Sequence, residues 1–135
     1  MCDNRYNRPL SCQYASQNLA LMPTLTLYHN PRCSKSREAL ALLESRGIDV
    51  NVHRYLDVPL SPSELTSLAR RLGDDAELML RQEEPEWRER GIEEPNREQM
   101  IAAIAEHPRL LQRPIVDDGQ YAVIGRPPQA VLQLI

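Results

Sequence analysis

A chain of 135 residues has the length of one domain, and its 41% hydrophobic and 26% charged residues are the ordinary balance of a soluble globular protein. A net charge of −3 argues against a general nucleic-acid binder, and no stretch approaches the roughly 18 consecutive apolar residues of a membrane span. Three cysteines, an odd number, argue against a disulfide-stapled secreted scaffold, so we expect a cytoplasmic protein.

The beginning of the chain differs in composition from the rest. Residues 1–23 are rich in Asn, Gln, Ser and Tyr and show no hydrophobic periodicity, which predicts a disordered tail. Met22 is a candidate start site as well as Met1. The tail holds Cys2 and Cys12, for which we expect no chemical role.

The folded domain, expected over residues 24–135, begins with a βαβ unit. Residues 25–28 (LTLY) are typical of a short strand. Apolar residues at helical spacing predict a helix over residues 34–46, which Gly47 ends, and residues 50–54 predict a second strand. A strand, a helix and a strand with short connections form a βαβ unit.

A helical region is predicted to follow. Residues 61–64 (SPSE) combine an N-cap serine, a proline at the first helical position and a glutamate three residues after the cap, and Gly73 marks the end of that helix. Short helices are expected over residues 75–81 and 86–90. A longer helix is expected over residues 96–106, capped by its first residue, an asparagine.

The chain ends with a predicted hairpin and a last helix. Residues 114–117 and 120–124 are expected to be strands on either side of Asp118-Gly119, a pair typical of a type I′ turn. Pro127 and the next proline are expected to open the final helix. The order β-α-β, helices, β-β-α predicts an α/β fold.

Cys33 is the candidate reactive residue, because it lies between a predicted strand and the N-terminus of a predicted helix. Free backbone N–H groups at that end of a helix stabilise an anion. Arg32, Lys35 and Arg37 add positive charge nearby. Together these features are expected to lower the pKa of the thiol from about 8.5 toward the roughly 3.5–7.5 range of reactive cysteines.

Neighbouring polar side chains are candidates to support the thiolate. Ser34 and Ser36 carry hydroxyl groups that would donate hydrogen bonds to it, and His29 would orient the loop or contribute charge. The alternative is a buried Cys33 that acts as a small hydrophobic residue. The polar, cationic surroundings favour the reactive thiol.

The sequence around Cys33 lacks a second thiol at the spacing that thioredoxins use. Lys35 and Ser36 occupy the next positions, so no Cys-x-x-Cys motif is present. A redox cycle at Cys33 would therefore need a thiol from another molecule, or from the tail.

Three arginines are candidate ligands of an oxyanion. Arg113 and Arg126 bracket the predicted hairpin, so the fold can bring them together, and Arg81 follows an apolar run. Guanidinium groups suit a tetrahedral oxyanion, because each can donate two hydrogen bonds. Taken singly, each arginine is more often a solvated surface residue. A cis peptide bond at Pro114, at the start of a strand, would turn the backbone toward Cys33.

Four motifs, in this order, resemble the glutaredoxin-dependent arsenate reductase family, and most closely its short branch often named YfgD-like. The similarity extends from Thr24 to Ile135. Where well-studied members have Gly-Thr after the cysteine, this chain has Ser34-Lys35, and it lacks their longer C-terminal extension. The motifs are YHNPRCSKSR (28–37), LMLR (78–81), RPIV (113–116) and GRPP (125–128).

The resemblance implies a thioredoxin-like fold, βαβ…ββα, with a helical insertion that contains the acidic residues 74–98. It implies that Cys33 is the catalytic nucleophile. It also implies roles for six other residues. Arg81, Arg113 and Arg126 would bind the oxyanion, His29 and Ser36 would support the thiolate, and Pro114 would be a cis-proline.

The activity implied by the resemblance is reduction of arsenate to arsenite, with glutathione as co-substrate, glutaredoxin as partner and no bound cofactor. The histidines and cysteines show no metal-ligand spacing, so we expect no metal. One alternative is an Spx-like regulator that responds to oxidants and binds RNA polymerase, although such sensors usually carry Cys-x-x-Cys. Another is a thiol oxidoreductase that acts on a different oxyanion or on a glutathione mixed disulfide.

Overall fold

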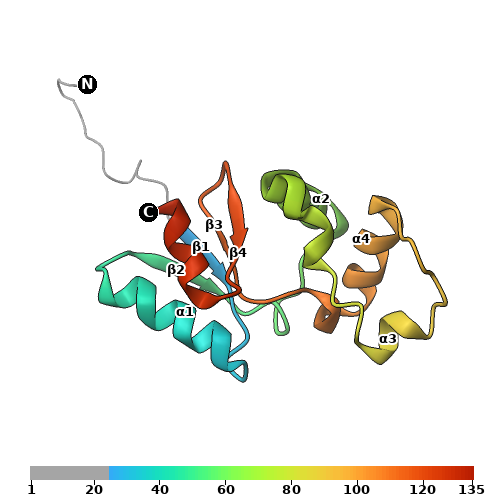
Figure 1. Cartoon of the computed structure of the whole chain (residues 1–135), viewed down its shortest axis with the longest axis horizontal. Helices are drawn as coiled ribbons and strands as arrows, with labels where there is room; N and C mark the ends of the chain where they lie inside the picture. Colours follow the sequence, from blue (N-terminus) through green and yellow to red (C-terminus); the bar gives the residue numbers. More distant parts are fainter. Residues whose placement is uncertain (1–24) are drawn as a thin grey trace.

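The computed structural model describes residues 25–135, which form a four-stranded sheet with helices on both of its faces (Figure 1). The tail expected over residues 1–23, with Cys2 and Cys12, lies outside the described part of the chain. Among the helices of the described residues, none is long and apolar enough to cross a membrane.

The sheet has the strand order β2-β1-β3-β4. Strand β1 (Leu25–Tyr28) pairs in parallel with β2 (Val50–His53) on one side. On its other side it pairs antiparallel with β3 (Ile115–Asp117), which forms an antiparallel hairpin with β4 (Ala122–Ile124). The C-terminal hairpin is therefore built onto the N-terminal βαβ unit through the central strand.

One face of the sheet is covered by α1 (Ser34–Ser45) and the C-terminal 3₁₀ helix η4 (Pro128–Leu134). Alternate residues of a strand point to opposite faces, so Leu25 and Leu27 share this side. The small core here consists of Leu25, Leu27, Ala39, Leu43, Val116 and Val131.

The helical insertion packs against the opposite face and forms the larger core. It comprises α2 (Pro62–Leu72), the 3₁₀ helix η2 (Gly73–Met79), α3 (Pro85–Arg88), α4 (Arg97–Glu106) and the 3₁₀ helix η3 (Pro108–Leu110). In Figure 1 this group lies on the other side of the sheet from α1. Its core joins apolar side chains of the insertion to Tyr28, Ile115 and Ala122 of the sheet.

Two of the helical starts confirm the sequence prediction in detail. Ser61 and Asn96 each cap their helix, with reciprocal bonds to Glu64 and Gln99. Such a capping box satisfies backbone N–H groups that the first turn leaves free. Gly73 ends α2 at a φ of +64°, a conformation that glycine adopts without strain.

A partly buried ion pair joins the insertion to the sheet. Arg71 on α2 donates from Nε and Nη2 to both oxygens of Asp117 on β3, at 2.7–3.0 Å. The hydroxyl of Tyr28 also donates to Asp117, at 3.3 Å. Burial, and the charge of this carboxylate, raise the pKa of Tyr28 to about 12. The neutral phenol therefore stays a donor across the physiological range.

The observed order confirms the predicted α/β, thioredoxin-like fold with a helical insertion. Two helical predictions were wrong in type. The segment expected as a helix over residues 75–81 is the 3₁₀ helix η2, which ends at Met79, and the last helix is also 3₁₀.

The predicted turn was wrong by one position. Strand pairing places Asp118 opposite Tyr121, so the two central residues are Gly119 and Gln120. The carboxylate of Asp118 accepts from the backbone N–H groups of Gln120 and Tyr121, both at 2.8 Å. These bonds fix the shifted turn, and Gly119 takes the left-handed conformation, with φ +97°.

Candidate active site

Cys33 is the N-cap residue of α1, directly after the loop that leaves β1. Its backbone is extended, and its carbonyl accepts the helical N–H of Arg37 at 3.0 Å. This places the sulfur beside the first turn, where N–H groups lack helical partners. Cys33 is only partly exposed, and it is the only cysteine of the described residues.

Two arginines from the C-terminal hairpin meet the sulfur. The backbone N–H of Gly125 donates to the carbonyl of Pro114 at 2.8 Å, and the Nε of Arg126 donates to the carbonyl of Arg113 at 2.9 Å. The Nη2 of Arg126 then lies 3.9 Å from Sγ of Cys33. The Arg113–Pro114 peptide bond, expected to be cis, is cis, and so is the bond between Arg126 and Pro127.

Gly125 permits this close approach of the two hairpin arms. A Cβ atom at this position would lie 2.8 Å from the Pro114 ring and 2.9 Å from the side chain of Val131. Both contacts are too short for any residue other than glycine unless the Pro114 ring and the Val131 side chain shift. The hairpin therefore holds the backbone of Arg113 and Arg126 in one defined arrangement.

The surroundings of Cys33 favour its thiolate. Partial burial raises the pKa of the thiol, but the backbone N–H of Ser36, the guanidinium of Arg113 and the backbone N–H of Lys35 lower it by more. The net pKa therefore lies below the ordinary value for cysteine. The helix N-terminus acts as the sequence predicted, but the cation that lowers the pKa is Arg113 and not the expected Arg32, Lys35 or Arg37.

His29 and Ser36 are bonded to each other beneath the loop. The Nδ1 of His29 lies 2.7 Å from the hydroxyl oxygen of Ser36, which also accepts the backbone N–H of Asn30 at 3.1 Å. Both side chains are buried. Burial and the nearby arginines Arg54 and Arg37 lower the pKa of His29, so its ring is neutral at pH 7.

This arrangement changes the roles expected from the sequence. The Ser36 hydroxyl was expected to donate to the thiolate, but its bonds are to His29 and Asn30, and the backbone N–H of Ser36 faces the sulfur instead. His29 was expected to orient the loop or to add charge, and a neutral ring provides orientation. The pair is placed to hold the loop that carries Cys33.

Arg81 lies in the helical insertion, and its bonds are to other residues of the insertion and not to Cys33. Leu80 and Leu111 form an antiparallel bridge, and the N–H of Arg81 donates to the carbonyl of Leu110 at 2.8 Å. This short pairing leads directly to Arg113, two residues beyond Leu111. The guanidinium of Arg81 is bonded to Glu84, with 2.9 Å between Nη1 and Oε2.

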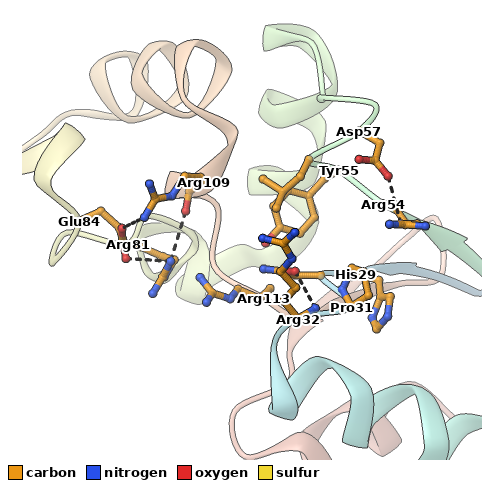
Figure 2. Close-up of a pocket in the computed structure, with 12 residues that line it drawn as sticks. His29, Pro31, Arg32, Arg54, Tyr55, Asp57, Arg81, Glu84, Arg109 and Arg113 are labelled. Atoms are coloured by element: carbon orange, nitrogen blue, oxygen red, sulfur yellow. Dashed lines mark hydrogen bonds and ion pairs between the residues drawn. The ribbon is translucent and has the colours of Figure 1, made fainter.

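A cleft of about 600 Å³ separates Arg81 from the loop before α1 (Figure 2). Figure 2 shows Arg81, Glu84 and Arg109 on one side, His29 and Arg54 on the other, and Arg113 between them. Cys33 does not line the cleft but follows Arg32, which does. The lining residues are His29, Asn30, Pro31, Arg32, Arg54, Tyr55, Leu56, Asp57, Arg81, Glu84, Arg109 and Arg113.

The sequence analysis did not single out Tyr55, which lines the cleft although only 1% of its surface is exposed. Burial raises the pKa of its hydroxyl, against the opposing charges of Arg113 and Arg81. Tyr55 is therefore a neutral hydrogen-bond donor beside two cations. Its position just after β2 carries no motif, so only the fold could identify it.

The arrangement combines a nucleophile with an anion site. A thiolate attacks an electrophilic centre, and guanidinium groups stabilise negative charge on the oxygens around that centre. Within residues 25–135, no group of three or more His, Cys, Asp or Glu side chains is placed to hold a metal ion.

A strand–loop–helix unit with a cysteine at the helix N-cap, together with a cis-proline just before β3, is typical of thioredoxin-like proteins. The chain belongs to the ArsC family, whose model matches residues 28–134. It is 47% identical over 109 residues to an arsenate reductase from Neisseria meningitidis, covering 78% of this chain and 93% of that relative. It is 40% identical over 112 residues to the protein YfgD from Escherichia coli, with 81% and 94% covered.

The fold agrees with a solved relative. An arsenate reductase from Vibrio cholerae superimposes with a TM-score of 0.78 at 42% identity, and the match covers 84% of this chain and 98% of that one. The described fold therefore corresponds to nearly the whole of a known member.

Proposed function

We propose that this protein reduces arsenate to arsenite, with Cys33 as nucleophile and with electrons from glutathione and glutaredoxin. The observation that carries the proposal is the position of Cys33 at the N-cap of α1, with Arg126 Nη2 at 3.9 Å and a lowered thiol pKa. Membership of the ArsC family and the names of the relatives support arsenate as the substrate.

In the first step, the Cys33 thiolate attacks arsenic. An S–As bond forms, and one oxygen takes up protons and leaves as water. Arg113 and Arg126 lie beside the sulfur and would offset the charge on the remaining oxygens. Tyr55 is available in the same region as a neutral donor to one of them.

Electrons then come from external thiols. Glutathione replaces a second oxygen on arsenic, and a glutaredoxin thiolate attacks the sulfur of glutathione. The As–S bond to glutathione breaks, its electron pair stays on arsenic as As(III), and the two sulfurs leave as a mixed disulfide. Water finally displaces arsenite from Cys33. Because the described residues hold no second cysteine, no disulfide can form within them. The need for glutathione suggests the cytoplasm as the site of this reaction.

The test is an arsenate reduction assay with glutathione and glutaredoxin. Cys33→Ser is expected to abolish turnover, because a hydroxyl at this position does not ionise near neutral pH. A variant with Cys2 and Cys12 both changed to serine is the matched control and should keep full activity. Arsenate turnover by Cys33→Ser would refute the assignment of the nucleophile.

A parallel assay tests the substrate class. Wild-type protein is given arsenate in one reaction and a mixed disulfide of glutathione with a small thiol in another, and each rate is corrected for a reaction that lacks the protein. We expect turnover with arsenate. Turnover with the disulfide alone would identify the protein as a thiol oxidoreductase of different specificity and would refute the proposed substrate.

A further inference from the structure

The side of the cleft that carries Arg81 is built from paired acids and bases. Arg81 and Arg109 are ion-paired there with three carboxylates, those of Glu83, Glu84 and Glu86. Two cations and three anions give this wall a formal charge of −1. The wall that carries Arg81 therefore has no net positive charge, although Arg81 itself is a cation.

Glu84 is the central group of this network. Its Oε2 lies 2.9 Å from Nη1 of Arg81, and its Oε1 lies 2.9 Å from Nη2 of Arg109. Each oxygen thus takes a different arginine. The side chain is only 12% exposed, whereas the side chains of Arg109 and Glu83 are 61% and 58% exposed.

Arg81 is consequently held by one end of its guanidinium group. Nη1 donates toward the carbonyl of Arg109 at 3.4 Å as well as pairing with Glu84. On the other edge, Nε is buried and makes no hydrogen bond, although the carboxylate of Glu83 lies 3.3 Å away. The Nε edge therefore already faces the carboxylate of Glu83, and Nη2 is the remaining nitrogen of this guanidinium group.

We propose that Glu84 is a positioning residue of the oxyanion site, which rests on the proposed function. It fixes Nη1 of Arg81, and Nη2, which donates no hydrogen bond among residues 25–135, is left for an oxygen of a substrate in the cleft. Arg109 holds the second oxygen of Glu84 and keeps that carboxylate in place. Glu84 acts on the substrate only through Arg81.

A contribution to folding stability explains the position of the Glu84 carboxylate less well. Removing a charge from water opposes the gain from an ion pair, so partly buried pairs contribute little net stability. The pair between Arg109 and Glu86, on a more exposed part of the wall, would suffice to anchor Arg109. The placement of Glu84 between two arginines is explained by what it does to Arg81.

The experiment measures steady-state arsenate reduction by Glu84→Ala and Glu84→Gln. Losing the group that orients a charged donor should raise KM for arsenate about tenfold in Glu84→Ala and about threefold in Glu84→Gln, which keeps one acceptor oxygen. The kcat should change less than about twofold, because Arg81 does not contact the sulfur. The pH dependence of Cys33 alkylation should not move. Glu89→Ala, an exposed change of equal charge in the same region, is the matched control and should leave KM unchanged.

A double variant separates positioning from a general structural effect. In an Arg81→Ala background, Glu84→Ala should cause no further rise in KM, because its route to the substrate is gone. A full additional rise in that background, or a KM equal to wild type in Glu84→Ala, would overturn the inference. If Glu84→Ala fails to fold, Glu84→Gln carries the same test. Wild-type protein that does not reduce arsenate would refute the proposed function instead.

Discussion

The two walls that carry the arginines of the candidate site are built on different principles. The wall formed by the start of α1 and the C-terminal hairpin places Arg113 and Arg126 beside Cys33, and of these three residues only Arg113 lines the cleft. Neither guanidinium pairs with a carboxylate among the described residues. The wall formed by the helical insertion presents Arg81, which is bonded to Glu84. The guanidinium groups of the first wall are not paired with carboxylates of the described residues, whereas the guanidinium group of Arg81 is paired with Glu84.

The difference indicates a division of roles. Free guanidinium groups beside a helix N-terminus lower the pKa of the thiol and stabilise charge in the transition state. A balanced arginine contributes a directed donor without adding net charge to the site. The first wall is therefore expected to control reactivity, and the second to control binding.

Among these substitutions, Arg113→Ala is expected to have the largest effect on activity, because it removes a guanidinium group from the first wall. It removes a cation that lowers the Cys33 pKa and lines the cleft, so kcat/KM for arsenate should fall about a hundredfold or more, the usual cost of losing an oxyanion donor. The pKa of Cys33 should rise, so that a higher pH is needed to form the thiolate. The pH profile of iodoacetamide alkylation measures the shift. A hundredfold loss without any pKa change would show that Arg113 does not act on the thiol.

Asp117→Asn is expected to have a smaller effect on activity but a clear one on stability. The change leaves Arg71 without its buried carboxylate, and it weakens the joint between the insertion and the sheet. Breaking such a pair costs about 3 kcal/mol of unfolding free energy. Urea denaturation measures it, with Asp118→Asn at the turn as the neighbouring control. Unchanged stability would mean that the apolar core alone fixes the two walls.

The sequence predicted the parts of the site that depend on local structure. The spacing of apolar residues predicted the strand, loop and helix around Cys33. The hairpin between Arg113 and Arg126 indicated that the fold can bring these two arginines together. The resemblance added the cis bond at Pro114.

The remaining parts depend on contacts between distant segments. Glu84 meets Arg109 only because Leu80 pairs with Leu111, and no periodicity in the sequence encodes that bridge. Tyr55 reaches the cleft because the insertion closes over it. The turn was displaced by one residue because the side chain of Asp118 captured backbone N–H groups, a local competition that the dipeptide alone does not reveal.

The most direct test of the central claim is a pH titration of the Cys33 thiol in a variant with Cys2 and Cys12 replaced by serine. The titration is followed by thiolate absorbance or by alkylation rate. The thiolate fraction rises with pH through the pKa. The account predicts a midpoint below that of an ordinary cysteine, so that the thiolate fraction at neutral pH exceeds that of a free thiol. A midpoint at or above the ordinary value of about 8.5 would contradict it.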